Sequence, residues 1–267
     1  MKPMIFNKRK FLQEIFLLRL LVRRNIKNQY YRSVIGVLWT VLNPLLNMLV
    51  MAFVFSVLFG TETDGLDYPI YILSGNIIFN IMRASTTSAL PCLVQQRDML
   101  LKSKVSVGIF PTANLFSSIV TFLFSLIALL IVMTIRYAFG FYTFHWQIFL
   151  LPLLLPALAL FSLGISFFLS AFYVFFRDIQ HIYSVILTLW TYLTPLFYSL
   201  KKLQNDAVAR LMIFNPMYHY ISLFRTMLIG SLPTISSFAV CYLFGGISIL
   251  IGSLFFKLMR PHIIARL

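Results

Sequence analysis

Asparagine side chains recur at helical spacing inside two long apolar stretches of the sequence. The first stretch carries the series Gly36, Thr40, Asn43 and Asn47, and the second carries Asn76, Asn80, Arg83 and Thr87. Both follow the spacing i, i+4, i+7 and i+11, so each lies on one face of a helix for about three turns. Such faces could form the wall of a polar conduit. Hydrogen bonding between neighbouring helices is an equally good interpretation.

Arg83 is the one basic residue that lies well inside an apolar stretch. A charge at such a depth is costly in free energy, so the guanidinium is expected to be paired or to face water. Asp98 and Asp178 are the acids available on the inner side, and the sequence does not choose between them.

Aromatic rings accompany the polar series. Three of them repeat every seven residues in the fifth apolar stretch, and another lies one residue off the first polar series. Flat rings beside polar groups suit sugar, whose C–H faces pack on aromatic planes. Anchoring at the membrane interface is the alternative, because Trp and Tyr are enriched there. We expect a conduit to be lined by Trp39, Asn43, Asn47, Tyr183, Trp190 and Phe197.

The sequence contains no recognisable catalytic or cofactor-binding motif. None of its glycines is followed by lysine, which excludes a P-loop, and neither HExxH nor GxSxG occurs. The four histidines lie in separate segments, and Cys92 and Cys241 fall near opposite membrane faces, so neither a metal site nor a disulfide is expected. We predict no catalytic, cofactor-binding or metal-binding residues. Uphill transport would need energy from a partner or from an ion gradient.

Composition assigns the chain to the membrane proteins. Its 267 residues are 60% hydrophobic and 11% charged, and the mean hydropathy is +0.89. A soluble domain could not bury so much apolar surface. The net charge of +15 could suggest a nucleic-acid partner. However, the basic residues concentrate in short loops on one side, as the positive-inside rule expects, so no nucleic acid is predicted.

Six stretches approach or exceed the roughly 20 residues that a membrane-spanning helix needs. We predict an all-α integral membrane protein with spans at 34–59, 69–90, 107–136, 146–176, 179–199 and 238–256. Residues 1–33 carry nine basic residues and one acid, which places both termini in the cytoplasm. The predicted organisation is a cytoplasmic segment (1–33), a transmembrane domain (34–256) and a cytoplasmic tail (257–267).

Two amphipathic segments are not predicted to span. Segment 11–30 carries three basic residues spaced by four on one face and apolar residues on the other, which predicts a helix in the cytoplasmic interface that contacts membrane lipids. Segment 215–230 begins with Asn215 and Pro216 and ends with Gly230, residues that suit the two ends of a helix. It predicts a short outer helix, re-entrant or gate-like, between the last two spans.

Short motifs follow one another along most of the chain. The segment 33–39 reads S-x-x-G-x-L-W, Asn43-Pro44 follows it, and FRDI, TPLFYS and NPM begin at 176, 194 and 215. In this order they resemble the membrane subunits of type-2 ABC exporters for cell-surface polysaccharides, namely the O-antigen, capsule and teichoic-acid permeases. The chain departs from that family at 104–111, KVSVGIFP, where no Arg follows the proline.

The resemblance implies a homodimer of this chain with two separate ATPase subunits, which would bind ATP and magnesium, in a bacterial cytoplasmic membrane. The implied substrate is a lipid-linked polysaccharide, and the first and fifth spans would line its conduit. A coupling segment at 91–106 would contact the ATPase through Gln96, Arg97, Asp98 and Lys102. An outer gate at 200–237 would involve Asn215, Pro216, Tyr220, Phe224 and Arg225.

Three other functions remain open at this point. A type-2 ABC efflux permease for drugs or lipids would keep the fold and change the substrate. A carrier driven by an ion gradient would need carboxylates within the membrane, and the predicted spans hold none. A scaffold that only organises partners would not export anything.

The missing P-loop leads to the first testable prediction. The purified chain should hydrolyse no ATP above background, because it has no glycine-rich loop to hold the phosphates. A coupled ATPase assay on the chain, with and without its ATPase subunit, measures this. Turnover by the chain alone that persists after a further purification step would contradict the proposed division of labour.

Overall fold

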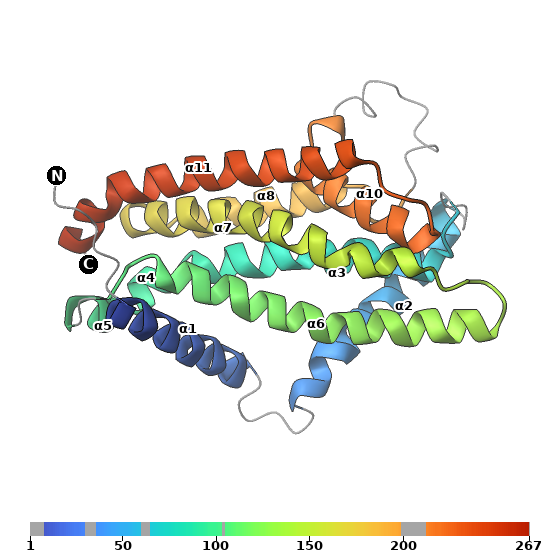
Figure 1. Ribbon diagram of the computed structural model, residues 1–267, viewed down its shortest axis with the longest axis horizontal. Coiled ribbons are helices and arrows are strands. Elements are labelled where there is room, and N and C mark those ends of the chain that lie inside the picture. The colour runs from blue at the N-terminus through green and yellow to red at the C-terminus, as the bar shows by residue number, and fades with distance from the viewer. Residues whose placement is uncertain (1–7, 30–35, 60–64, 103–104, 199–211, 267) are drawn as a thin grey trace.

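The computed structural model describes residues 8–29, 36–59, 65–102, 105–198 and 212–266. The described elements are α-helices and short 3-10 turns, with no strand among them, which confirms the all-helical prediction. The end of α11 (Ile235–Arg266) lies at the same end of the elongated bundle as α4 (Cys92–Gln95) and α5 (Arg97–Lys102) (Figure 1). Helix α10 (Pro216–Ile229) lies towards the opposite end.

Helix α1 (Lys8–Gln29) occupies the segment predicted to be amphipathic. Helices then occupy each of the six predicted spans: α2 (Trp39–Phe59), α3 (Tyr68–Ala89), α6 (Ile109–Ala138), α7 (Leu151–Phe175), α8 (Ile179–Leu193) and α11. Among the described residues, three stretches are long and apolar enough to cross a membrane, namely α6, α11 and the continuous stretch Trp146–Phe175. The six-span count itself stays a prediction.

Helix α3 is the central helix of the bundle. Fifteen of its 22 residues are buried, whereas only five of the 32 residues of α11 are. Helices α2, α6, α7, α8 and α10 all pack against α3. Its apolar faces are therefore enclosed by protein, whereas the polar face with Asn76, Asn80, Arg83 and Thr87 is half-buried or exposed. Helix α11 presents most of its apolar surface outwards.

A second apolar core lies at the α4 end of the bundle. It joins Leu21 of α1, Leu93 of α4, Phe110 of α6 and Ile263 of α11. Ile263 lies in the segment 257–267, whose assignment as a cytoplasmic tail stays a prediction. Helix α11 continues to Arg266 because Ile263 is fully buried there and fixes the additional turns.

Helix α8 ends six residues earlier than the predicted fifth span. Thr194 follows it with extended backbone angles (φ −93°, ψ 132°) because the next residue is Pro195, and the position before a proline disfavours helix. With 15 residues, α8 is about 22 Å long. The chain from Thr194 to Phe197 is buried but not helical, and its carbonyl groups need partners outside a helix.

Helices α7 and α11 approach each other so closely that their backbones touch. A Cβ atom added at Gly252 of α11 would lie 2.0 Å from the carbonyl oxygen of Gly164 in α7. One at Gly245 would lie 2.7 Å from the oxygen of Ala157. Ser248, between these glycines, donates a hydrogen bond to the Phe161 carbonyl at 2.8 Å. The series Gly245, Ser248 and Gly252 therefore acts as a helix-packing surface.

This contact leads to a prediction with a matched control. Gly252→Ala should lower the free energy of unfolding by about 1–3 kcal/mol, since the methyl group forces the helices apart. Gly246→Ala lies on the same helix, and nothing lies within 4 Å of its added Cβ. The control should be neutral or slightly stabilising. Thermal unfolding of both variants in detergent tests this, and equal melting temperatures would contradict the close approach.

Candidate functional site

A central cavity of about 400 Å³ lies between α2, α3 and α8. Both polar series predicted from the sequence contribute to it, with Asn43 and Asn47 from α2 and Asn76 and Asn80 from α3. No hydrogen bond joins the α2 amides to the α3 amides within the described residues. In this structure the two series thus face a shared space, as a conduit wall would, and are not bonded directly to each other.

Arg83 projects into the central cavity from α3. One guanidinium nitrogen donates to the hydroxyl of Thr191 on α8, and the guanidinium lies 5.2 Å from the centre of the Phe79 ring. The Nε atom is buried and has no hydrogen-bond partner. Neither Asp98 nor Asp178, the partners considered from the sequence, is bonded to it.

Of the aromatic residues predicted to line the conduit, two lie at the central cavity or at the surface, and two are packed inside the protomer. Phe197 lines the central cavity and stacks on Phe55 of α2, with ring centres 4.7 Å apart and planes 11° apart. Trp39 is 36% exposed at the start of α2. Tyr183 is instead buried, donating to Thr86 of α3 at 2.7 Å.

Trp190 is enclosed by protein on several sides. Its ring packs edge-on against Phe79 and Phe161, and its indole nitrogen donates to the side chain of Asn215 at 2.8 Å. Within one protomer, Tyr183 and Trp190 therefore fasten α8 to its neighbours. A conduit role for these two residues stays a prediction.

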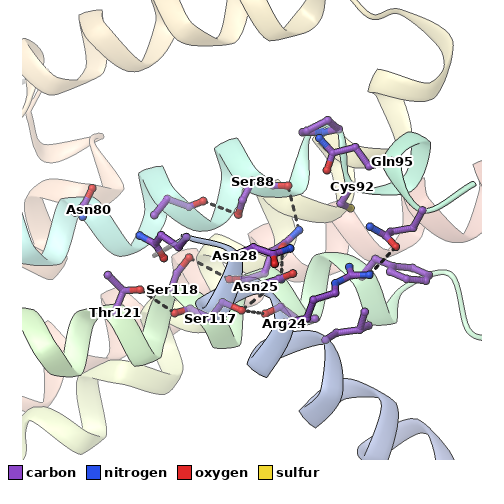
Figure 2. A pocket seen from close by; sticks show the side chains of 18 residues that line it. Arg24, Asn25, Asn28, Asn80, Ser88, Cys92, Gln95, Ser117, Ser118 and Thr121 are labelled. Carbon is purple, nitrogen blue, oxygen red and sulfur yellow. Dashed lines mark hydrogen bonds between the residues drawn. The ribbon is translucent and has the colours of Figure 1, made fainter. Parts of the chain in front are cut away.

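An inner cavity of about 670 Å³, which was not predicted from the sequence, lies between α1, α3 and α6. Figure 2 shows amide and hydroxyl side chains from all three helices pointing towards one another there. Asn25 of α1 donates to Asn114 of α6 at 2.8 Å, and Asn114 donates to the Ser88 carbonyl of α3 at 3.0 Å. No carboxylate side chain lines this cavity among the described residues.

A pattern in the sequence could have predicted the inner cavity. Helix α6 carries a third polar series with the same spacing as the other two, namely Asn114, Ser118, Thr121 and Ser125. Its first three members line the inner cavity and its last lines the central cavity. Asn80 of α3 lines both cavities. Polar side chains therefore continue from the α4 end of the bundle to its middle.

Within the described residues, the predicted coupling segment forms two short helices, of which α4 lines the inner cavity. Arg97, Asp98 and Lys102 are exposed on α5, whereas Gln96, between α4 and α5, accepts a hydrogen bond from Arg24 of α1 at 3.1 Å. The segment is thereby joined to α1. Cys92 of α4 borders the cavity, and burial raises the pKa of its thiol, so the thiol stays protonated at neutral pH.

Arg225 of α10 forms an outer latch with the irregular chain that follows α8. It is 7% exposed and donates to the carbonyls of Pro195 at 2.8 Å, Leu196 at 3.1 Å and Tyr71 at 3.0 Å. Tyr71 also donates to the Tyr198 carbonyl at 2.7 Å. Carbonyl groups left unpaired by the end of α8 are thus satisfied by side chains of α10 and α3.

The other predicted gate residues surround this latch. Asn215 caps α10 by accepting from the Met217 amide at 3.1 Å, and Pro216 begins the helix. Tyr220 is fully buried and donates to the Cys241 carbonyl of α11 at 2.7 Å, and Phe224 is fully buried beside it. Helix α10 is consequently held by α3, α11 and the end of α8.

The comparisons with known proteins agree with this architecture. A family profile described as ABC-2 type transporter matches residues 17–229, which include both cavities and the latch. The chain belongs to the ABC-2 type transporter family. It is an integral membrane transport subunit, and among its described residues no group of His, Cys, Asp and Glu could hold a metal ion.

Two curated relatives of this ABC-2 permease carry the same name, O-antigen export system permease protein RfbA. One, from Myxococcus xanthus, is 31% identical over 208 residues, which is 78% of this chain and 78% of the relative. Another, from Klebsiella pneumoniae, is 23% identical over 247 residues, which is 91% of this chain and 92% of the relative.

The outer latch of the permease generates a prediction. Arg225→Lys keeps the charge but cannot donate to three carbonyls in the same fork-like geometry, so it should lower the free energy of unfolding by roughly 2–4 kcal/mol. Arg177→Lys is the control, because Arg177 is exposed after α7. The melting temperatures of both variants and of the parent protein test this. If Arg225→Lys melted at the same temperature as Arg177→Lys and the parent, the latch would be refuted.

Proposed function

We propose that this ABC-2 permease exports a lipid-linked cell-surface polysaccharide of the O-antigen or teichoic-acid type across a bacterial cytoplasmic membrane. A separate ATPase subunit, which binds ATP and magnesium, drives the export. The observation that carries the proposal is the continuous series of neutral amides and hydroxyls in the inner and central cavities, inside a bundle of otherwise apolar helices. The names of the two relatives support the same class of substrate.

Neutral amides suit a long glycan for an energetic reason. Each hydrogen bond between an amide and a sugar hydroxyl contributes only about 0.5–1.5 kcal/mol net, so a sugar can leave one amide and bind the next. Strong binding at any one sugar would stop the movement of the polymer. The spacing of Asn25, Asn114, Asn80 and Asn76 offers successive weak sites of this kind.

In the predicted topology the coupling segment would face the cytoplasm, where an ATPase could move it. Arg97, Asp98 and Lys102 offer exposed charges, while Gln96 connects the segment to α1 through Arg24. A displacement of α4 and α5 would be transmitted to α1 and would reshape the inner cavity. ATP on the partner subunit supplies the differential affinity that such a two-state change requires.

A second copy of the chain would complete the conduit. The central cavity is bounded by α2 and α8, and the outward face of α8 is apolar, with Val185 60% and Leu189 59% exposed. In a symmetric pair these faces would meet lipid or the partner protomer, with both termini of each chain in the cytoplasm.

The polar walls of the cavities favour a glycan substrate over the apolar drugs that the alternative efflux permease would transport.

The proposal is tested by export from vesicles that contain this chain and its ATPase subunit. Arg97→Glu should reduce ATP-dependent translocation of lipid-linked polysaccharide by tenfold or more, because like charges placed opposite each other across a protein interface cost several kcal/mol. ATP hydrolysis should persist, as the catalytic site lies on the other subunit.

The matched control is Arg260→Glu, an exposed residue on the last turns of α11 outside the coupling segment. This variant should export normally. Equal export by both variants would show that the coupling surface does not lie on α5. Failure of the unaltered complex to move any lipid-linked glycan with ATP would reject the proposed function.

A further inference from the structure

The positive charge of Arg83 has no acidic partner within the part of the chain that the structure describes. Its contacts are the Thr191 hydroxyl and the Phe79 ring, and its Nε–H is buried without an acceptor. Asp67, one of the described acids, is already bonded to Arg136 at 2.6 Å. The remaining acids of the sequence are Glu14, Glu62, Asp64, Asp98, Asp178 and Asp206.

Two of the described acids, Asp67 and Asp178, would not supply the missing charge from a second copy of the chain. Rotation about an axis perpendicular to the membrane keeps every residue at its own depth. Asp67 precedes α3 and lies 16 residues from Arg83, about 24 Å along the helix axis. Asp178 precedes α8 and lies 13 residues, about 20 Å, from Thr191, the residue that Arg83 contacts. At such separations neither carboxylate compensates the guanidinium.

The surroundings of Arg83 offer hydrogen-bond donors. Asn43 and Asn47 of α2 line the same cavity as Arg83, and Asn76 and Asn80 lie on the same face of α3 as Arg83. A guanidinium has five N–H groups in a planar fork, which matches two oxygens of one phosphate or carboxylate. An unpaired cation inside apolar helices is costly, so its presence indicates a ligand that bears the opposite charge.

We propose that Arg83 and the amides of the central cavity form an oxyanion site that binds a phosphate or carboxylate group. The binding follows from the geometry of the cavity alone, whereas its use during export rests on the proposed function. The group would belong either to the phosphate that links a glycan to its lipid or to an acidic sugar within the glycan. The neutral amides let uncharged sugars pass, and Arg83 holds the charged group.

The first experiment measures anion binding by the full chain in nanodiscs of phosphatidylcholine, which has no net charge. Inorganic phosphate and glucuronate are titrated by calorimetry at constant ionic strength set with chloride. Saturable binding of at least one anion is expected, and Arg83→Gln should weaken it tenfold or more. Tighter phosphate binding would assign the site to the lipid linkage, and tighter glucuronate binding would assign it to acidic sugar.

Two variants control for binding elsewhere and for charge. Arg19→Gln removes the same charge from the exposed face of α1 and should leave the affinity unchanged. Arg83→Lys keeps a charge without the fork and should bind more weakly than the parent but more tightly than Arg83→Gln. Saturable binding that Arg83→Gln retains in full, or the absence of saturable binding by the parent, would overturn the site.

A stability measurement separates a ligand site from a structural role. If Arg83 chiefly holds α8 through Thr191, Arg83→Met should lower the melting temperature. A residue kept for a ligand should instead give a neutral or more stable variant that no longer binds phosphate, because the uncompensated charge is removed. A destabilised Arg83→Met together with unchanged anion binding in Arg83→Gln would overturn the proposal.

Export assays distinguish the failure of this inference from the failure of the proposed function. ATP-driven export without any Arg83-dependent anion binding would reject the oxyanion site and leave the exporter function intact. Arg83-dependent anion binding without export of any lipid-linked glycan would reject the function and leave the site intact. Loss of both export and anion binding in Arg83→Gln, with export preserved in Arg19→Gln, is the expected result.

Discussion

A polar group inside an apolar helical bundle must find a partner or a polar space, and the structure depends on how helix α3 meets this constraint. One side of α3 contributes Asn76, Asn80 and Arg83 to the cavities. Elsewhere the hydroxyls of Tyr68 and Tyr71 donate to carbonyls of the chain beyond α8, at 3.1 Å to Phe197 and 2.7 Å to Tyr198. The tyrosine hydroxyls thereby find partners and the amides find a polar space, whereas the buried Nε–H of Arg83 has no acceptor within the described residues.

Helical periodicity predicted the features that depend on one helix at a time. It placed Asn43 and Asn47 on one face and gave Asn215 and Pro216 as the start of α10, as observed. It could not show that Tyr183 points into the protomer, because a repeat of seven fixes a helix face but not the neighbour of that face. Tertiary packing decides which face of a helix is buried. In α8 the buried faces are those towards α3 and α7.

The inner cavity was missed for a related reason. Asn25 and Asn114 meet across 89 positions of sequence, and only the docking of α1 on α6 brings them together. The hydroxyls of Ser118 and Thr121 could be recognised as a polar series, but hydroxyls in helices commonly bond to their own backbone, as Ser118 does to the Asn114 carbonyl at 3.0 Å. A series of such residues therefore indicates a cavity less strongly than a series of amides.

The early end of α8 at Pro195 has a consequence for the surrounding bilayer. A helix of about 22 Å cannot match a hydrocarbon layer of about 30 Å, so lipid beside α8 has to thin locally or be replaced by protein. In the predicted topology the outer part of that layer would be occupied by α10 and the buried turn, which Arg225 joins through hydrogen bonds. Hydrophobic mismatch would then be absorbed within the protein, and the packing of α10 would depend on the acyl-chain length of the membrane.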